Sequence, residues 1–155
     1  MALVVEQSRA IPVSIDDAFA GTLPRPLPTI FRRWYGPIPP VKRVHDQVGK
    51  WDAAGQTRTV VLVGGGSMRE QLTSVDPPRS FGYTLTDIKG PMAPLVDLVE
   101  GEWTFTPVGT GTVVAWRWTL HPRSPLAALA LPILGRLWKG YARRALEELS
   151  AQLVG

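Results

Sequence analysis

An apolar side chain recurs every three or four residues from Ser124 to Val154, the spacing that aligns side chains on one face of an α-helix. The members of this face are Leu126, Ala130, Leu134, Leu137, Tyr141, Ala145 and Leu149. Ser124 is a favourable N-cap residue and a proline follows it, so the sequence predicts one helix that begins there. Leu129 and Ile133 make the first half apolar almost all round, and we expect other parts of the chain to cover it on several sides.

The chain before this helix has the pattern of an antiparallel sheet. From Val41 onward, turn sequences recur at intervals of eight to twelve residues, which is typical of strands joined by hairpins. The predicted strands are 3–11, 41–48, 56–63, 67–75, 80–88, 95–106 and 112–120, and two short helices are expected at 14–23 and 29–35. This order predicts an α+β fold in which a seven-stranded antiparallel sheet curls around the long C-terminal helix.

The composition limits the classes of site and of partner. The 155 residues suit one domain, 1–155, with a single core. The sequence contains no cysteine, which excludes a disulfide, a thiolate metal site and a cysteine nucleophile. The N-terminus lacks the features of a secretory signal, and the longest apolar run, 125–134, is too short to cross a bilayer, so a cytoplasmic protein is expected. The formal charge of +4 is scattered, and nucleic acid is not an expected partner.

Side chains alternate between the two faces of a strand, and this alternation places a large aromatic set on the face toward the helix. The set comprises Phe81, Tyr83, Trp103, Phe105, Trp116 and Trp118. Glu70 falls on the same face, and burying an unpaired carboxylate costs several kcal/mol. We therefore expect Glu70 to have a partner, for which Arg58, Tyr83 and His45 on neighbouring strands are the candidates.

Two interpretations fit the six tryptophans of the sequence. Indole rings fill a core well, because each buries ~150–250 Å2. They also suit the wall of a ligand cavity, where flat faces and a single N–H donor can hold an apolar or polycyclic guest. The residues alone leave both interpretations open.

Short motifs follow one another in a characteristic order along nearly the whole chain. They are Ile11-Pro12-Val13-Ser14, Trp34, Gly55 with Arg58, Gly64 to Gly66 with Glu70, Val75 to Arg79 with Tyr83, and Gly111-Thr112 with Val114 and Trp116. This order resembles the SRPBCC superfamily, also called the START or birch-pollen-allergen-like helix-grip fold. The resemblance is greatest to its polyketide cyclase/dehydrase and lipid-transport group.

The resemblance implies a cavity between the long helix and the concave face of the sheet. Members of the superfamily use it to carry lipids, sterols, hormones and polyketides, and a minority catalyse reactions there. It therefore implies binding or carriage of a hydrophobic or amphipathic small molecule, such as a lipid or polyketide. No cofactor is expected. A polyketide cyclase/dehydrase-type enzyme with a pocket acid or base is the alternative. A second alternative is an interaction module whose cavity is filled by its own tryptophans.

The residues expected to bind the ligand are Trp34, His45, Arg58, Glu70, Tyr83, Trp103, Trp116, Trp118, Leu134, Trp138 and Tyr141. No catalytic residue is assigned. His45 is either a pocket group or an exposed strand residue, and His121 is expected at the surface. No set of His, Asp and Glu has the spacing of metal ligands, so no metal site is expected.

The apolar start of the last helix, 126–134, allows one further interpretation. This segment is also suited to transient contact with a membrane surface or a partner. Arg123, Arg136 and Lys139 lie near it, and each basic residue near an anionic lipid surface contributes about 1 kcal/mol of attraction.

Overall fold

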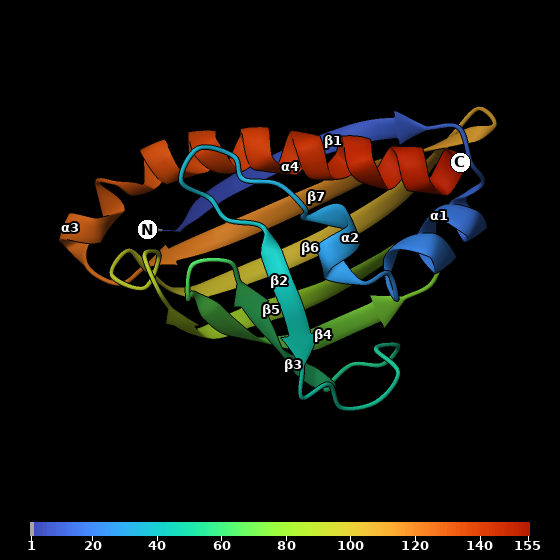
Figure 1. Cartoon of the computed structure of the whole chain (residues 1–155). Coiled ribbons are helices and arrows are strands. Elements are labelled where there is room, and N and C mark those ends of the chain that lie inside the picture. The colour runs from blue at the N-terminus through green and yellow to red at the C-terminus, as the bar shows by residue number, and fades with distance from the viewer. Residues whose placement is uncertain (1) are drawn as a thin grey trace.

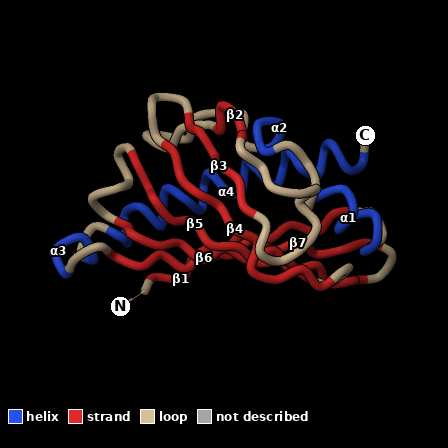
Figure 2. The backbone as a smooth tube through the Cα atoms, turned by 90° about the horizontal axis from the view of Figure 1, so that it is seen from below, coloured by secondary structure: helices blue, strands red, loops and turns tan. Residues whose placement is uncertain are grey.

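The computed structural model describes residues 2–155, and its main feature is a seven-stranded antiparallel sheet of order β1-β7-β6-β5-β4-β3-β2 (Figure 1). The strands are β1 (Leu3–Ile11), β2 (Val41–His45), β3 (Thr57–Leu62), β4 (Ser67–Asp76), β5 (Ser80–Lys89), β6 (Val96–Val108) and β7 (Gly111–Pro122). The sheet curls around the C-terminal helix, so the α+β helix-grip prediction is confirmed (Figure 2). Met1 of the predicted domain lies outside the described residues.

The two short helices after β1 are α1 (Ile15–Thr22) and α2 (Leu27–Ile30). Ser14 caps α1 as predicted, since its Oγ accepts a backbone N–H of the first turn at 3.1 Å. The predicted position of the second helix, 29–35, is wrong, because α2 begins earlier and is only one turn long. Pro28 lies in the first turn of α2. A backbone N–H at that position has no acceptor within the helix, so its absence in proline costs no helical hydrogen bond.

The C-terminal helix is interrupted near its start. The one-turn helix α3 (Pro125–Ala128) comes first and α4 (Leu131–Val154) follows it, so the predicted single helix is wrong at this point. Ser124 caps α3 as predicted, by accepting a backbone N–H at 3.1 Å. The break precedes Pro132, whose ring has no N–H with which to continue the hydrogen-bond ladder from α3.

The start of this helical region is exposed rather than covered. Leu126, Leu129 and Ile133 expose 77%, 75% and 67% of their surface, which contradicts the expectation that other parts of the chain cover them. Farther along, α4 lies close to β1, because a Cβ on Gly135 would be only 3.0 Å from side-chain atoms of β1. Leu126, Leu129 and Ile133 therefore leave apolar surface uncovered, whereas Ala127 and Leu131 between them are buried.

The C-terminal half of α4 closes one end of the molecule. Its buried residues are Tyr141, Ala142, Ala145, Leu146, Leu149 and Ser150. At the same end, the ring of Phe19 from α1 packs edge-on against Phe81 and Phe105, with centroid distances of 6.0 and 5.3 Å. This region is an ordinary close-packed core.

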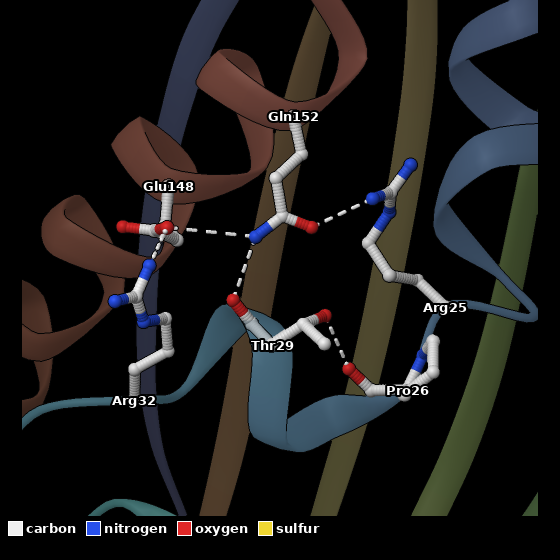
Figure 3. A network of polar contacts seen from close by, with 6 residues as sticks. All are labelled: Arg25, Pro26, Thr29, Arg32, Glu148 and Gln152. Carbon is white, nitrogen blue, oxygen red and sulfur yellow. Dashed lines mark hydrogen bonds and ion pairs between the residues drawn. The ribbon is translucent and has the colours of Figure 1, made fainter. Parts of the chain in front are cut away.

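A polar network fastens the α2 region to the last turns of α4 (Figure 3). Arg25 Nη1 donates to Gln152 Oε1 at 2.6 Å, and Gln152 Nε2 donates to the carbonyl of Thr29 at 2.7 Å. Arg32 pairs with Glu148 at 2.6 Å. These contacts hold α2 and the connection that follows it beside α4, above the concave face of the sheet.

Candidate functional site

A cavity of about 420 Å3 lies between the concave face of the sheet and α4. Its volume falls within the ordinary range for small-molecule sites, about 300–1,000 Å3. The wall is mostly apolar, and strands β2 to β7, α2, the α2–β2 connection and α4 all contribute to it. Ten of the predicted binding residues line the cavity, namely Trp34, Arg58, Glu70, Tyr83, Trp103, Trp116, Trp118, Leu134, Trp138 and Tyr141. Their contact with a ligand stays a prediction.

The two histidines lie outside the cavity. His45 ends the edge strand β2 with its side chain 43% exposed, and its Nδ1 lies 2.9 Å from a carboxylate oxygen of Asp46. Its predicted place among the binding residues is therefore corrected, because the side chain is turned to solvent. His121 lies near the surface as predicted and contacts Glu100 at 2.7 Å. Within residues 2–155, the cavity wall thus offers no imidazole base.

The main polar feature of the wall is an ion pair between neighbouring strands. Arg58 of β3 and Glu70 of β4 are cross-strand partners, and Arg58 Nε donates to Glu70 Oε1 at 2.7 Å. Each residue is only 5% exposed. Among the candidates expected to pair with Glu70, the ion-pair partner is therefore Arg58. The ring of Trp51 covers the guanidinium, with 3.8 Å from its centroid to Cζ, a cation–π distance.

This ion pair retains hydrogen-bonding capacity for a ligand. The bond between the two side chains uses one N–H of the guanidinium, which has five, and one of the two carboxylate oxygens. Burial raises the pKa of Glu70 above its ordinary value, and the charge and hydrogen bond of Arg58 oppose this increase. The pair therefore places donors and an acceptor in an otherwise apolar wall.

Tyr83 joins two indole rings at the centre of the sheet. Its oxygen accepts Trp116 Nε1 at 2.8 Å and Trp118 Nε1 at 2.9 Å. The ring lies against the backbone of Gly101, where any Cβ would collide with the ring carbons, so only glycine fits at that position. Burial, and after it the charge of Glu70, raises the pKa of Tyr83, so the hydroxyl stays protonated at neutral pH. Since its oxygen accepts both indole bonds, its own hydrogen remains available to donate.

The helix contributes two further polar groups. Trp138 is 1% exposed and its ring centroid lies 4.8 Å from that of Trp116. Its Nε1 has no hydrogen-bond partner within residues 2–155, and a buried donor without a partner is uncommon. Tyr141 donates to the carbonyl of Pro39 at 3.1 Å, and burial raises the pKa of this phenol. Among the described residues, the Trp138 N–H is thus a donor without a partner that its neighbours enclose.

Two important contributors to the wall are absent from the predicted set. Trp51 lies in the β2–β3 connection with a φ of 60°, a backbone conformation that no sequence period indicates. Phe31 follows α2 and stacks on Tyr141, with 5.7 Å between centroids and 9° between ring planes. The abundance of tryptophan in the sequence was a signal that could have indicated Trp51 as a wall residue. No sequence signal indicated Phe31.

Other types of site find no support in the part of the chain that the structure describes. Residues 2–155 contain no group of three His, Cys, Asp or Glu side chains placed to hold a metal ion. Over the same residues, no helix combines the length and apolar character needed to cross a bilayer.

The sequence matches the family described as "Polyketide cyclase / dehydrase and lipid transport" over residues 2–154. The chain belongs to this family. The resemblance to the SRPBCC superfamily that the sequence motifs predicted is thereby confirmed. A search of curated proteins gave no match.

Several solved structures share the fold of this family member at low sequence identity. Norcoclaurine synthase from Thalictrum flavum, in complex with dopamine and hydroxybenzaldehyde, has a TM-score of 0.74 at 14% identity, over 99% of this chain and 87% of that chain. Ara h 8.0201 has a TM-score of 0.71 at 12% identity, over 99% of both chains. A protein from Thermus thermophilus has a TM-score of 0.69 at 19% identity, over 98% of this chain and 97% of that chain.

The SRPBCC superfamily is known for binding hydrophobic ligands, and some of its members are cyclases. At these identities the structural likeness shows the fold alone. The function of this chain must therefore be argued from its own cavity.

Proposed function

We propose that this protein binds a hydrophobic or amphipathic small molecule in the cavity between the sheet and α4, as a carrier or sensor. The observation that carries the proposal is the 420 Å3 of space that remains although Trp51, Trp103, Trp116 and Trp138 are buried around it. Empty space in a core is unfavourable, at about 24 cal/mol per Å3 in measured Leu→Ala cavities. A bound apolar molecule offsets this cost, and unfilled space argues against a cavity closed by its own indoles.

The polar groups of the wall indicate which ligand chemistry fits. The Arg58–Glu70 pair carries no net charge, and Tyr83 adds a neutral donor. A ligand hydroxyl or carbonyl can bond to these groups without bringing in an unpaired charge. A ligand carboxylate would lie in a low-dielectric wall that already holds the carboxylate of Glu70. The cavity therefore suits a neutral polar group attached to an apolar, ring-rich body more than a fatty-acid head.

The test fills the cavity with a tryptophan side chain. It compares dye binding by that variant with dye binding by a variant that carries the same substitution at a neighbouring position of the same strand. Leu62 lines the cavity, whereas its neighbour Val61 does not. The wild-type protein and Val61→Trp are expected to enhance the fluorescence of Nile red, and Leu62→Trp to lose most of this enhancement. Equal dye binding by the two variants, or none by the wild type, would overturn the proposal.

A cyclase-type enzyme is the second candidate, and the free O–H of Tyr83 is the observation that favours it. A positioned proton donor of this kind typically contributes about 10²–10⁴-fold to a reaction rate. Tyr83→Phe distinguishes the two functions when the ligand extracted from the purified protein is incubated with each form. A carrier leaves both the mass and the chromatographic retention of the ligand unchanged in both cases. An enzyme converts it, and Tyr83→Phe then retains binding but loses conversion.

A further inference from the structure

The cavity reaches the surface beside the start of α4. Trp34, Lys89 and Ile133 line the cavity and are also exposed, so the wall continues to the outside at this point. The surrounding segments, which we call the mouth, are residues 31–40, 62–66, 89–95 and 123–137. Figure 1 shows α3 and the β5–β6 connection together at one end of the sheet, with the α2–β2 connection reaching along α4 toward them.

Direct contacts join these segments into a rim. Arg123 Nε donates to the carbonyl of Ala93 at 2.6 Å, which links the start of α3 to the β5–β6 connection. A Cβ on Gly64 would lie 3.8 Å from Trp34 Cη2, so the β3–β4 hairpin lies next to the α2–β2 connection. A Cβ on Gly90 would lie 2.7 Å from Gly66 Cα, which joins the two pairs of segments, so the mouth is one continuous surface although its parts are far apart in the sequence.

The rim presents large apolar side chains to the outside. Leu126, Leu129, Ile133 and Trp34 each expose more than half of their surface. Leu126 and Leu129 do not line the cavity, so a ligand inside it leaves them uncovered. Leu126 lies in α3 and Leu129 is its C-cap residue, and α3 projects from the end of the molecule (Figure 1). A projecting apolar turn, on a rim that also exposes a tryptophan, suits insertion at a membrane interface.

The formal charge of the mouth is entirely positive. Its sequence contains no Asp or Glu, and its charged residues are Arg32, Arg33, Lys89, Arg123 and Arg136. Arg32 is paired with Glu148, which lies outside the mouth. Arg33 lies beside the same carboxylate, so Lys89, Arg123 and Arg136 are the basic residues left to this surface. An apolar projection with basic side chains on neighbouring segments is complementary to a surface that has anionic headgroups above acyl chains.

We propose that the mouth docks on an anionic lipid bilayer. Leu126 and Leu129 enter the acyl region, and Lys89 and Arg136 lie among the headgroups. The opening of the cavity then faces the bilayer, so that an amphipathic ligand exchanges with the membrane without passing through water. This docking extends the proposed function, but it does not require a ligand in the cavity.

The test is flotation of the protein with vesicles of phosphatidylcholine, with and without phosphatidylglycerol. The wild type is expected to float with the anionic vesicles, less so at high salt. The double variant Leu126→Gln/Leu129→Gln should partition at least about tenfold more weakly, because two leucine side chains lose their burial. The control is Val108→Gln/Val154→Gln, which removes two exposed apolar residues away from the mouth and should float like the wild type.

The contribution of charge is tested in the same assay. Arg136→Gln should weaken partitioning about fivefold, the effect of roughly 1 kcal/mol per basic residue near an anionic surface. Arg143→Gln, an exposed arginine of α4 outside the mouth, is the matched control.

Three results would overturn the docking proposal. They are equal flotation with neutral and anionic vesicles, equal flotation of both double variants, and a wild type that stays in solution. A dimer that Leu126→Gln/Leu129→Gln dissociates, in a protein that ignores vesicles, would assign the patch to self-association instead. Nile red binding without vesicles is measured on the same proteins, so failure of the cavity proposal is seen separately.

Discussion

The two ends of α4 have opposite environments although one continuous helix connects them. At the C-terminal end, Leu146 and Leu149 are 1% and 0% exposed, and the hydrogen bonds of Gln152 fix the neighbouring α2 region. At the N-terminal end, Ile133 is 67% exposed and a cavity lies behind it. We call the C-terminal end of α4 the closed end, because it has the close packing that stabilises a fold. We call the N-terminal end the open end, because it borders an unfilled cavity and exposes apolar side chains. Stability and access to the cavity are therefore assigned to different parts of one helix.

The largest effect is expected from breaking the ion pair in the cavity wall. Arg58→Met or Glu70→Met alone leaves a buried charge without its partner and should lower the free energy of unfolding by about 3–5 kcal/mol. The double variant Arg58→Met/Glu70→Met should be close to the wild type or more stable, because no charge is then buried. Chemical denaturation of the three variants measures the coupling. Losses that simply add in the double variant would show that the two side chains do not act as a pair.

A comparison of two leucines on α4 tests the difference between its ends directly. Leu149→Ala creates a new cavity in the closed end and should cost about 2–5 kcal/mol of unfolding free energy. Leu134→Ala enlarges a space that already exists, and for a half-buried side chain the cost should be nearer ~1 kcal/mol. Both values come from urea or guanidinium titrations of otherwise identical proteins. Equal losses at the two positions would mean that the open end is as tightly packed as the closed one.

Tyr83→Phe removes the acceptor of two indole N–H groups at once. The expected loss is about 1–3 kcal/mol, because buried donors are left unsatisfied. Tyr35→Phe is the control, since that ring packs against Gly140 of α4 and lies outside the indole bonds of Tyr83. Thermal or chemical unfolding measures both. A Tyr83→Phe protein as stable as Tyr35→Phe would argue against the two indole bonds.

The smallest effect is expected at the surface ion pair of the closed end, and it depends on pH. The hydrogen bond from Arg32 lowers the pKa of Glu148 below its ordinary value of 4.5. A lowered folded-state pKa gives stability that is present above pH 4.5 and is lost as the pH falls through that folded-state value. Glu148→Gln should therefore cost up to about 1 kcal/mol at pH 7 and little in acid. Glu147→Gln, an exposed neighbour on the same helix, is the matched control.

Much of the fold could be predicted because strands and turns leave local signals. The alternation of large and small residues along β5 to β7 correctly placed Tyr83, Trp103 and Trp116 on the inner face. Glycine and proline turns separated the strands from Val41 onward. A carboxylate on the inner face required a partner, and of the three candidates Arg58, Tyr83 and His45 the ion-pair partner is Arg58. These inferences need only the two-residue period of a strand and the cost of burying a charge.

The errors concern features that depend on distant parts of the chain. The helical period of residues 126–134 is genuine, but Pro132 breaks the helix and nothing packs over Leu129. Whether an apolar face is covered depends on the length and direction of other segments, and no local pattern contains that information. The same holds for His45, whose strand lies at the sheet edge, and for Trp51, which an irregular connection places on Arg58.

The most direct test of the open cavity is native mass spectrometry of the freshly purified protein, followed by solvent extraction of what it carries. The prediction is a complex heavier than the 17.0 kDa chain by the mass of one small apolar molecule, which extraction releases. The mass of that molecule would identify the ligand class and supply the substrate for the Tyr83→Phe comparison. A bare chain that also fails to bind Nile red would contradict the ligand-binding role of the cavity.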